Sequence, residues 1–147
     1  MDVKNKRVVV TGAASGIGKA LCEAFYQAGA QSLIAVDMNL DGAQETADSV
    51  NGIAIQANVG NEKDIINVIK KADEHVDGTD IFCSNAGIGG VPGFFEVEAS
   101  DWQNIWDVNV QSHIFAAKHV LPQMIERGEG YLVNTSSAAG LLTQLGA

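Results

Sequence analysis

The sequence predicts an α/β protein with a doubly wound parallel sheet, formed by a single domain over residues 1–147. Three observations predict this fold. Short apolar runs alternate with segments of helical periodicity, a glycine-rich stretch joins the first run to the first helix, and polar or glycine residues follow the runs. Closely spaced strand–helix units favour parallel strands joined by right-handed crossovers, with helices covering both faces of the sheet.

The first part of the chain contains two strand–helix pairs. Arg7–Val10 is a short apolar run, which is typical of a buried strand. Apolar residues recur at helical spacing over Ile17–Ala28, and the glycine that follows ends this helix. Ser32–Val36 is the second strand and has Asp37 at its carboxyl end. Asn39 then caps a short helix that extends to about residue 50.

The middle of the chain repeats this pattern. Ile53–Val59 is expected to be the third strand, and Asn61 caps the helix that follows it. That helix has its apolar positions at Ile65, Ile66, Ile69 and Ala72. A fourth strand at Ile81–Cys83 runs directly into the segment SNAG. Each of these strands is short and apolar, as strands buried on both faces are.

The last part of the chain predicts one long helix and a fifth strand. Ser100 and Gln103 have the spacing of a capping box, which begins a helix that runs to about Met124. Gly130 precedes the fifth strand at Tyr131–Asn134. With no further strand after it, this segment is expected to form an apolar edge of the sheet.

The ends of the strands predict where the site lies. Ligands of doubly wound sheets bind beyond the carboxyl ends of the strands, near the point where the strand order reverses. The polar or glycine-rich segments at these ends are Thr11-Gly12, Asp37, Asn58, Ser84-Asn85-Ala86-Gly87 and Thr135-Ser136-Ser137. We therefore expect these segments to converge on one edge and to form the candidate site.

Composition excludes several classes of protein. The net charge of −9 comes from 18 acidic and 9 basic residues, which argues against a nucleic-acid partner because such a surface needs a clustered positive field. Neither a membrane span nor a secretory signal is recognisable, so we expect a cytoplasmic protein. Cys22 and Cys83 are expected to be buried thiols. His75 and His119 have no partners at metal-ligand spacing, so no metal is expected.

The stretch TGAASGIG joins the first strand to the first helix. Gly12, Gly16 and Gly18 remove side chains where the backbone must turn and where a diphosphate must approach the start of the helix. The spacing differs from the G-x-G-x-x-G dinucleotide fingerprint. A tight turn with close helix–strand packing is the alternative interpretation. The strand before it and the amphipathic helix after it favour phosphate binding.

Asp37 indicates which dinucleotide is bound. It follows Gly18 by nineteen residues, close to the separation of about 20 at which an acidic residue binds the adenosine ribose. A carboxylate accepts hydrogen bonds from both ribose hydroxyls but repels a 2′-phosphate, and Met38 supplies no compensating cation. This pattern favours NAD over NADP. The alternative is a solvated loop aspartate.

These segments resemble those of the classical short-chain dehydrogenase/reductase family. The similar motifs are Thr11–Gly18, Asn85-Ala86-Gly87, Asn109 and Val133–Gly140, which occur in the family's order along essentially the whole chain. The resemblance implies a Rossmann-type fold and NAD-dependent interconversion of an alcohol and a carbonyl compound. The cofactor-binding residues that it implies, together with the residue patterns above, are Gly12, Ser15, Gly16, Ile17, Gly18, Asp37, Met38, Asn58, Val59, Asn85, Ala86 and Gly87.

Two departures from the family's pattern fall within these motifs. Ser84 stands where the family usually has the first of two asparagines, and Asn58 stands where it more often has an aspartate beside the adenine. An asparagine carbonyl can still accept a hydrogen bond from the adenine amino group. Asn85, Ala86 and Gly87 are implied to form a wall beside the adenosine.

The resemblance also implies two residues of the reaction site. Ser137 is implied to hydrogen-bond the substrate oxygen, while Ser136 supports the turn. Asn109 is implied to bend the long helix and to hold a water in a proton relay. Its spacing from Trp102 and Trp106 places it on the stripe that these tryptophans are expected to bury, so a satisfied core amide is the alternative. His113 is expected to be packed or at a subunit surface.

The family's general acid/base motif, Tyr-x-x-x-Lys, is absent. The only tyrosines are Tyr26 and Tyr131, and neither is followed by lysine four residues later. We therefore expect a fold that is incomplete at its carboxyl-terminal side, a fragment of a longer dehydrogenase that is inactive alone. A non-catalytic nucleotide-binding or regulatory module is the alternative. The family commonly forms dimers and tetramers, so a homo-oligomer is expected, and its small-molecule alcohol or carbonyl substrate is not readable.

Overall fold

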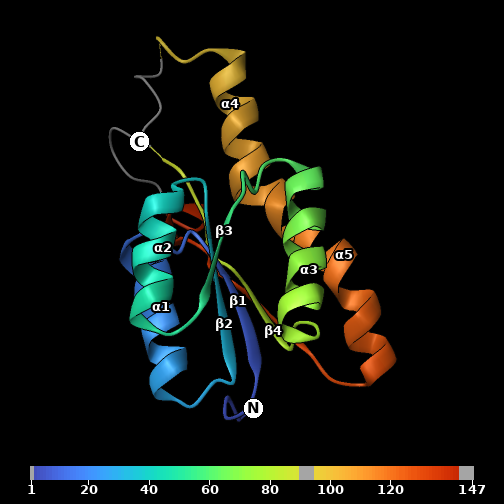
Figure 1. Ribbon diagram of the computed structural model, residues 1–147. Coiled ribbons are helices and arrows are strands. Elements are labelled where there is room, and N and C mark those ends of the chain that lie inside the picture. The colour runs from blue at the N-terminus through green and yellow to red at the C-terminus, as the bar shows by residue number, and fades with distance from the viewer. Residues whose placement is uncertain (1, 90–94, 143–147) are drawn as a thin grey trace.

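The computed structural model describes residues 2–89 and 95–142, and its centre is a five-stranded sheet (Figure 1). All strand pairs are parallel, and the strand order is β3-β2-β1-β4-β5. The order reverses between β1 and β4, which confirms the predicted doubly wound sheet. The strands are β1 (Arg7–Thr11), β2 (Ser32–Asp37), β3 (Ile53–Gln56), β4 (Ile81–Ser84) and β5 (Tyr131–Asn134).

The helices cover the two faces of this sheet. Figure 1 shows α1 and α2 on one side and α3 and α5 on the other, so the molecule has three layers. A short 3₁₀ turn, η2, follows β5 near the end of the described residues. The helical elements are α1 (Gly16–Gln27), α2 (Leu40–Ser49), α3 (Glu62–Val76), α4 (Ala99–Trp106), η1 (Asp107–Gln111), α5 (Ser112–Arg127) and η2 (Ala138–Gly140).

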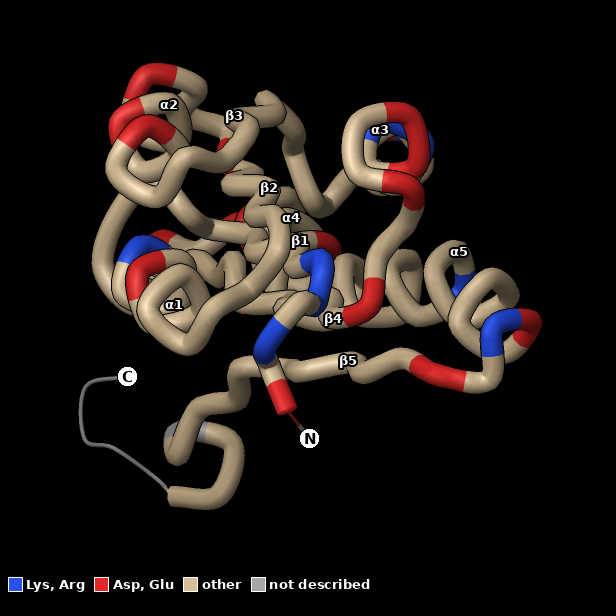
Figure 2. Tube along the Cα trace, turned by 60° about the horizontal axis from the view of Figure 1, so that its bottom comes forward, with Lys and Arg blue, Asp and Glu red and all other residues tan. Residues whose placement is uncertain are grey.

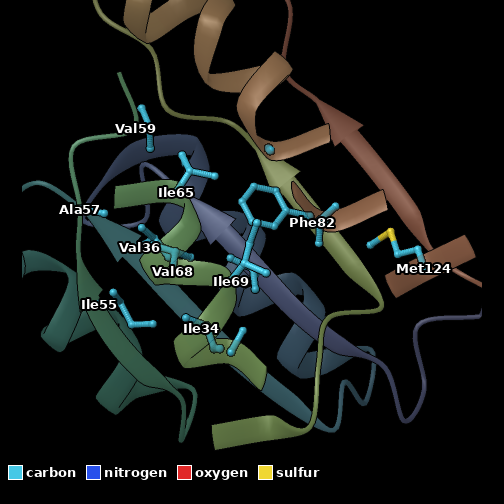
Figure 3. Close-up of a cluster of buried hydrophobic side chains, with 14 of the residues drawn as sticks. Ile34, Val36, Ile55, Ala57, Val59, Ile65, Val68, Ile69, Phe82 and Met124 are labelled. Carbon is cyan, nitrogen blue, oxygen red and sulfur yellow. The ribbon is translucent and has the colours of Figure 1, made fainter. Parts of the chain in front are cut away.

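Each face of the sheet has its own buried core. Successive side chains of a strand point to opposite faces, so Val8 and Val10 pack toward α1 and α2 while Val9 packs toward α3 and α5. Figure 3 shows the second core, where Phe82 of β4 lies near Ile65 and Ile69 of α3. These two cores fix the strand ends in space, and therefore the site at their carboxyl edge.

Two helix caps agree with the sequence prediction and one does not. The Asn39 side chain accepts from the Gly42 amide at the start of α2, and the Asn61 side chain accepts from the Lys63 amide at the start of α3. The capping box predicted at Ser100 and Gln103 is wrong. Glu98 is the N-cap of α4, and the side chain of Asp101 accepts from the Glu98 amide at 2.9 Å. Here two carboxylates, those of Glu98 and Asp101, form the capping box, whereas the usual sequence pattern begins with serine or threonine.

The long helix differs from its prediction. It extends to Arg127 rather than Met124, and it is interrupted by the π-helical turn η1. A π-helical turn holds more residues than an α-helical turn, so residues before and after it do not keep the face that α-helical spacing predicts. Trp102 and Trp106 precede this turn on α4 and are each more than half exposed, so the predicted buried tryptophan stripe is wrong.

The edges of the sheet show one further correction. β3 ends at Gln56, so the predicted strand Ile53–Val59 is too long, and Asn58 and Val59 lie after the strand in a turn. The turn forms because the Asn58 amide donates to the Asp64 carboxylate at 2.9 Å and the Asn58 side chain accepts from the Gly60 amide at 3.0 Å. At the opposite edge, β5 is mostly exposed, as predicted for an apolar edge strand.

The charge distribution matches the acidic composition. Figure 2 shows acidic residues along the outer helices α2 and α3, and it shows β5 at the side of the sheet beyond β4. Across residues 2–89 and 95–142, no helix is long and apolar enough to cross a membrane.

Candidate functional site

The loop between β1 and α1 depends on its glycines in two different ways. Gly12 and Gly16 have φ values of +71° and +53°, in the left-handed region that other residues rarely adopt. Gly18 has an ordinary φ, but a Cβ placed on it would overlap the Gly12 carbonyl group, 2.6 Å from its carbon. The loop can therefore turn back tightly and let α1 pack directly against the end of β1.

The start of α1 has backbone amides available for an anion. The first amides of a helix have no carbonyl partner within the helix, and they carry its positive partial charge. Ser15 is the N-cap residue, yet its side chain makes no capping hydrogen bond, whereas the N-cap side chains of α2 and α3 do. This helix start can bind the oxygens of a phosphate group.

Asp37 lies at the end of β2, beside this loop. One of its carboxylate oxygens accepts from the Ala14 amide at 2.9 Å, and the other accepts from the Asn39 amide at 2.9 Å. These bonds fix the orientation of the carboxylate. Each oxygen can accept a further hydrogen bond, so two neighbouring hydroxyl groups of a ligand can bind there.

Thr11 and Asn85 join β1 to β4 at the switch point. The buried Thr11 hydroxyl accepts from the amides of Asn85 at 2.9 Å and Ala86 at 3.1 Å. The Asn85 side chain donates to the Thr11 carbonyl at 3.1 Å and accepts from the Thr135 hydroxyl at 2.9 Å. These bonds fix the position of the Asn85–Gly87 backbone relative to the glycine-rich loop.

These segments enclose one cleft of about 390 Å³ at the carboxyl edge of the sheet. Every cofactor-binding residue predicted from the sequence lines it, from the glycine-rich loop through Asp37 and Asn58 to Asn85–Gly87. Thr135, expected at this edge of the sheet but not as a cofactor-binding residue, lines it too. The prediction missed three lining residues, whose only sequence signal is their nearness to a strand end or to Asn109. They are Ala57, Ile88 and Val108.

Asn58 has a restricted role in this cleft. Its side-chain oxygen already accepts from the Gly60 amide at 3.0 Å, which holds the turn after β3. The oxygen keeps a second lone pair for a ligand donor. Val59 beside it is buried and contributes an apolar wall.

A second cleft of about 540 Å³ adjoins the first and shares its Asn85–Ile88 wall. Asn109, Ser136 and Ser137 line it. The Asn109 side chain accepts from the Ile88 amide and donates to the Ile88 carbonyl, each at 2.8 Å. Asn109 is therefore a satisfied amide in the π-helical turn η1, only partly buried, and not a core amide beside buried tryptophans.

His113 and His119 are partly buried, and both cysteines are buried. His113 lines the second cleft, and its buried Nδ1 has no hydrogen-bond partner within residues 2–89 and 95–142. His119 contacts the Glu62 carboxylate at 2.8 Å. Burial raises the pKa of the Cys22 and Cys83 thiols to about 12, so neither is a reactive thiolate. Among the described residues, no three or more His, Cys, Asp or Glu side chains are grouped to hold a metal ion.

The geometry agrees with comparisons to known proteins. The short chain dehydrogenase family model matches residues 6–147. The chain belongs to the short chain dehydrogenase family. The resemblance stated from the motifs is thereby confirmed, and the family is one of oxidoreductases that use nicotinamide cofactors.

Individual relatives of this short chain dehydrogenase are moderately similar. A 3-oxoacyl-[acyl-carrier-protein] reductase from Vibrio cholerae is 32% identical over 99% of the chain, and an uncharacterized oxidoreductase from Staphylococcus aureus (strain MRSA252) is 32% identical over 92% of it. A crystal structure of a short-chain type dehydrogenase/reductase from Mycobacterium marinum matches 98% of the chain with a TM-score of 0.91 and 27% identity. The matched region spans 60% of the length of each of these three proteins.

Proposed function

We propose that this chain is the dinucleotide-binding part of an NAD-dependent oxidoreductase that interconverts an alcohol and a carbonyl compound. The observation that carries the proposal is the position of Asp37, whose carboxylate lies beside the glycine-rich loop and lines the same cleft. A diphosphate site and a ribose site that lie side by side in one cleft fit one dinucleotide.

The residues of the cleft fit NAD. The absence of side chains at Gly12 and Gly18 leaves room for close backbone packing, and the first amides of α1 would bind the diphosphate. The Asp37 carboxylate would accept from the adenosine ribose hydroxyls and repel the 2′-phosphate of NADP. Met38, which lines the cleft and is largely exposed, provides no positive charge to offset that repulsion.

The second cleft would hold the reacting part of the substrate. Bound NAD supplies a nicotinamide ring that can accept or donate a hydride. Ser137 would donate a hydrogen bond to the substrate oxygen and stabilise negative charge that develops there. Asn109 would keep the Ile88 backbone fixed beside this position through its two hydrogen bonds, and a water relay through it is part of the same proposal.

Asp37→Ala is expected to shift the affinity ratio of NAD to NADP by roughly tenfold or more toward NADP, because charge-assisted hydrogen bonds contribute about 1.5–3 kcal/mol. Calorimetric titration of both cofactors measures this ratio. Any damage to the loop from the lost Ala14 bond affects the shared diphosphate site in both titrations, so the ratio isolates the ribose contact.

The matched control for this prediction is Asp41→Ala. Asp41 is an exposed carboxylate in the first turn of α2 and does not line the cleft, so the ratio is expected to stay at the wild-type value. An unchanged ratio in Asp37→Ala would remove Asp37 from ribose recognition.

The polypeptide of residues 1–147 is expected to bind NAD but to show negligible turnover with secondary alcohols. Neither tyrosine lines either cleft. Tyr26 lies on α1, and Tyr131 begins β5 at the amino-terminal ends of the strands, whereas the clefts lie at the carboxyl-terminal ends. A serine hydroxyl such as that of Ser137 is a poor proton acceptor near neutral pH without an adjacent base. NADH absorbance measures turnover, and robust NADH formation would overturn this expectation.

A further inference from the structure

Helix α2 contacts the glycine-rich loop through Thr46. This side chain is fully buried, and its hydroxyl oxygen lies 2.8 Å from the Ala13 carbonyl oxygen and 3.1 Å from the Gly42 carbonyl oxygen. Carbonyl oxygens have no proton, so the hydroxyl must be the donor. The shorter distance identifies the Ala13 carbonyl as its principal acceptor, which joins α2 to the loop.

The peptide group between Ala13 and Ala14 is held on both of its edges. Its carbonyl accepts from Thr46, and its amide donates to the Asp37 carboxylate at 2.9 Å. The preceding amide, that of Ala13, donates to the Val36 carbonyl at 3.1 Å. The backbone at the middle of the loop is therefore fixed by β2 and α2 together, and the same peptide orients Asp37.

Close packing brings α2 near enough for this contact. A Cβ placed on Gly42 would lie 2.7 Å from the Ala14 Cβ, so only glycine lets the start of α2 approach the loop this closely. Thr46 follows one turn later on the same face of α2. Gly42 thus sets the approach, and Thr46 forms the hydrogen bond.

We propose that Thr46 is a positioning residue for dinucleotide binding, an inference that rests on the proposed function of the cleft. Thr46 does not line the cleft, so it acts through the Ala13–Ala14 peptide. A loop with several glycines has many accessible conformations, and fixing one peptide group in advance reduces the entropy lost when a diphosphate binds. The bond also supports the carboxylate that would contact the ribose.

The test is a comparison of Thr46→Val with Thr46→Ser. Valine keeps the shape of threonine but has no hydroxyl, and it is expected to weaken NAD binding about tenfold by calorimetry at a temperature where every variant is folded. Serine restores the hydroxyl and is expected to bind NAD within about twofold of wild type.

Thr79→Val is the matched control. Thr79 is also fully buried, but its hydroxyl has no hydrogen-bond partner among the described residues, and it lies just before β4, at the amino-terminal ends of the strands. The same isosteric change there is expected to leave the NAD affinity unchanged. If Thr46→Val lowers the melting temperature but keeps the wild-type affinity for NAD, Thr46 is merely structural and the proposal is wrong.

Amide hydrogen exchange separates this inference from the proposed function. In protein without ligand, Thr46→Val is expected to speed exchange of the Ala14 amide about tenfold, while Thr46→Ser and Thr79→Val leave it unchanged. If wild-type protein fails to bind NAD, the proposed function fails, and the Ala14 exchange rate still decides whether Thr46 holds the loop. An unchanged Ala14 rate in Thr46→Val would overturn the positioning role.

Discussion

Gly18→Ala is expected to abolish measurable NAD binding, with a loss of affinity of at least about a hundredfold. The new Cβ would overlap the Gly12 carbonyl group and lie 2.9 Å from the Asn85 side-chain nitrogen. The Gly12 carbonyl is backbone and cannot rotate away, so α1 must shift from β1 and take its first amides with it. Overpacking of this kind destabilises a protein by roughly 1–3 kcal/mol. Calorimetry with NAD and urea unfolding measure the two effects.

Gly16→Ala is the matched control, because it makes the same chemical change two residues earlier. A Cβ on Gly16 meets no atom of the described part of the chain within 4 Å, so the expected penalty is that of its left-handed φ of +53°. That penalty is about 1–2 kcal/mol, and the fold and the α1 start are expected to persist with moderately weaker NAD binding. Wild-type NAD affinity in Gly18→Ala would show that close α1–β1 packing is not needed for the site.

Asp80→Asn is expected to lower the free energy of unfolding by about 3 kcal/mol, in the range for loss of one partner from a buried ion pair. The Asp80 carboxylate accepts from the Arg7 guanidinium at 2.6 and 2.8 Å and from the Arg7 amide at 2.9 Å. Both side chains are largely buried. An asparagine would turn donor hydrogens toward the guanidinium, which would keep, among the described residues, only its hydrogen bond to the Asp77 carbonyl and the more distant Asp77 carboxylate at 3.7 Å. Urea unfolding at neutral pH measures this change.

The same carboxylate predicts how stability depends on pH. The hydrogen bond from Arg7 lowers the pKa of Asp80 below its usual value of 3.8. A lowered pKa means that the folded state releases this proton more readily, so the stabilisation is complete above the unfolded value and is lost as the pH falls through the folded value. Unfolding curves of Asp80→Asn are therefore expected to show a weaker loss of stability in acid than those of the wild type.

Two controls accompany Asp80→Asn, an exposed ion pair and the NAD affinity of the variant. The ion pair of Lys70 and Glu74 is exposed on α3, so Glu74→Gln is expected to change stability little. Asp80 and Arg7 lie at the amino edge of the sheet, so the NAD affinity of folded Asp80→Asn is expected to match wild type. Equal stability of Asp80→Asn and wild type would show that this ion pair does not hold the sheet together.

Much of the fold and the site follows from short-range signals in the sequence. Each strand is a short apolar run, and Asn39 and Asn61 cap helices as their types predict. Parallel strands place all their carboxyl ends at one edge, so the residues that follow each apolar run predict the position of the cleft. The glycine-rich loop, Asp37 and Asn85 are adjacent in space for this reason.

Other features depend on tertiary contacts that no local pattern encodes. The Thr46–Ala13 bond spans 33 positions, and the Thr135–Asn85 bond spans 50. The π-helical turn at Asp107–Gln111 changes which faces of the helix are buried, and nothing in the apolar spacing marks it. That is why the Thr135–Asn85 contact and the role of Thr46 could not be predicted from the sequence.

The crystal structure of this polypeptide with saturating NAD tests the central claim most directly. Electron density for the diphosphate is expected against the backbone amides at the start of α1, between Gly12 and Gly18, with both adenosine ribose hydroxyls within hydrogen-bond distance of the Asp37 carboxylate. Density for NAD at another place, or an empty cleft at saturating concentration, would contradict the assignment of this cleft as the dinucleotide site.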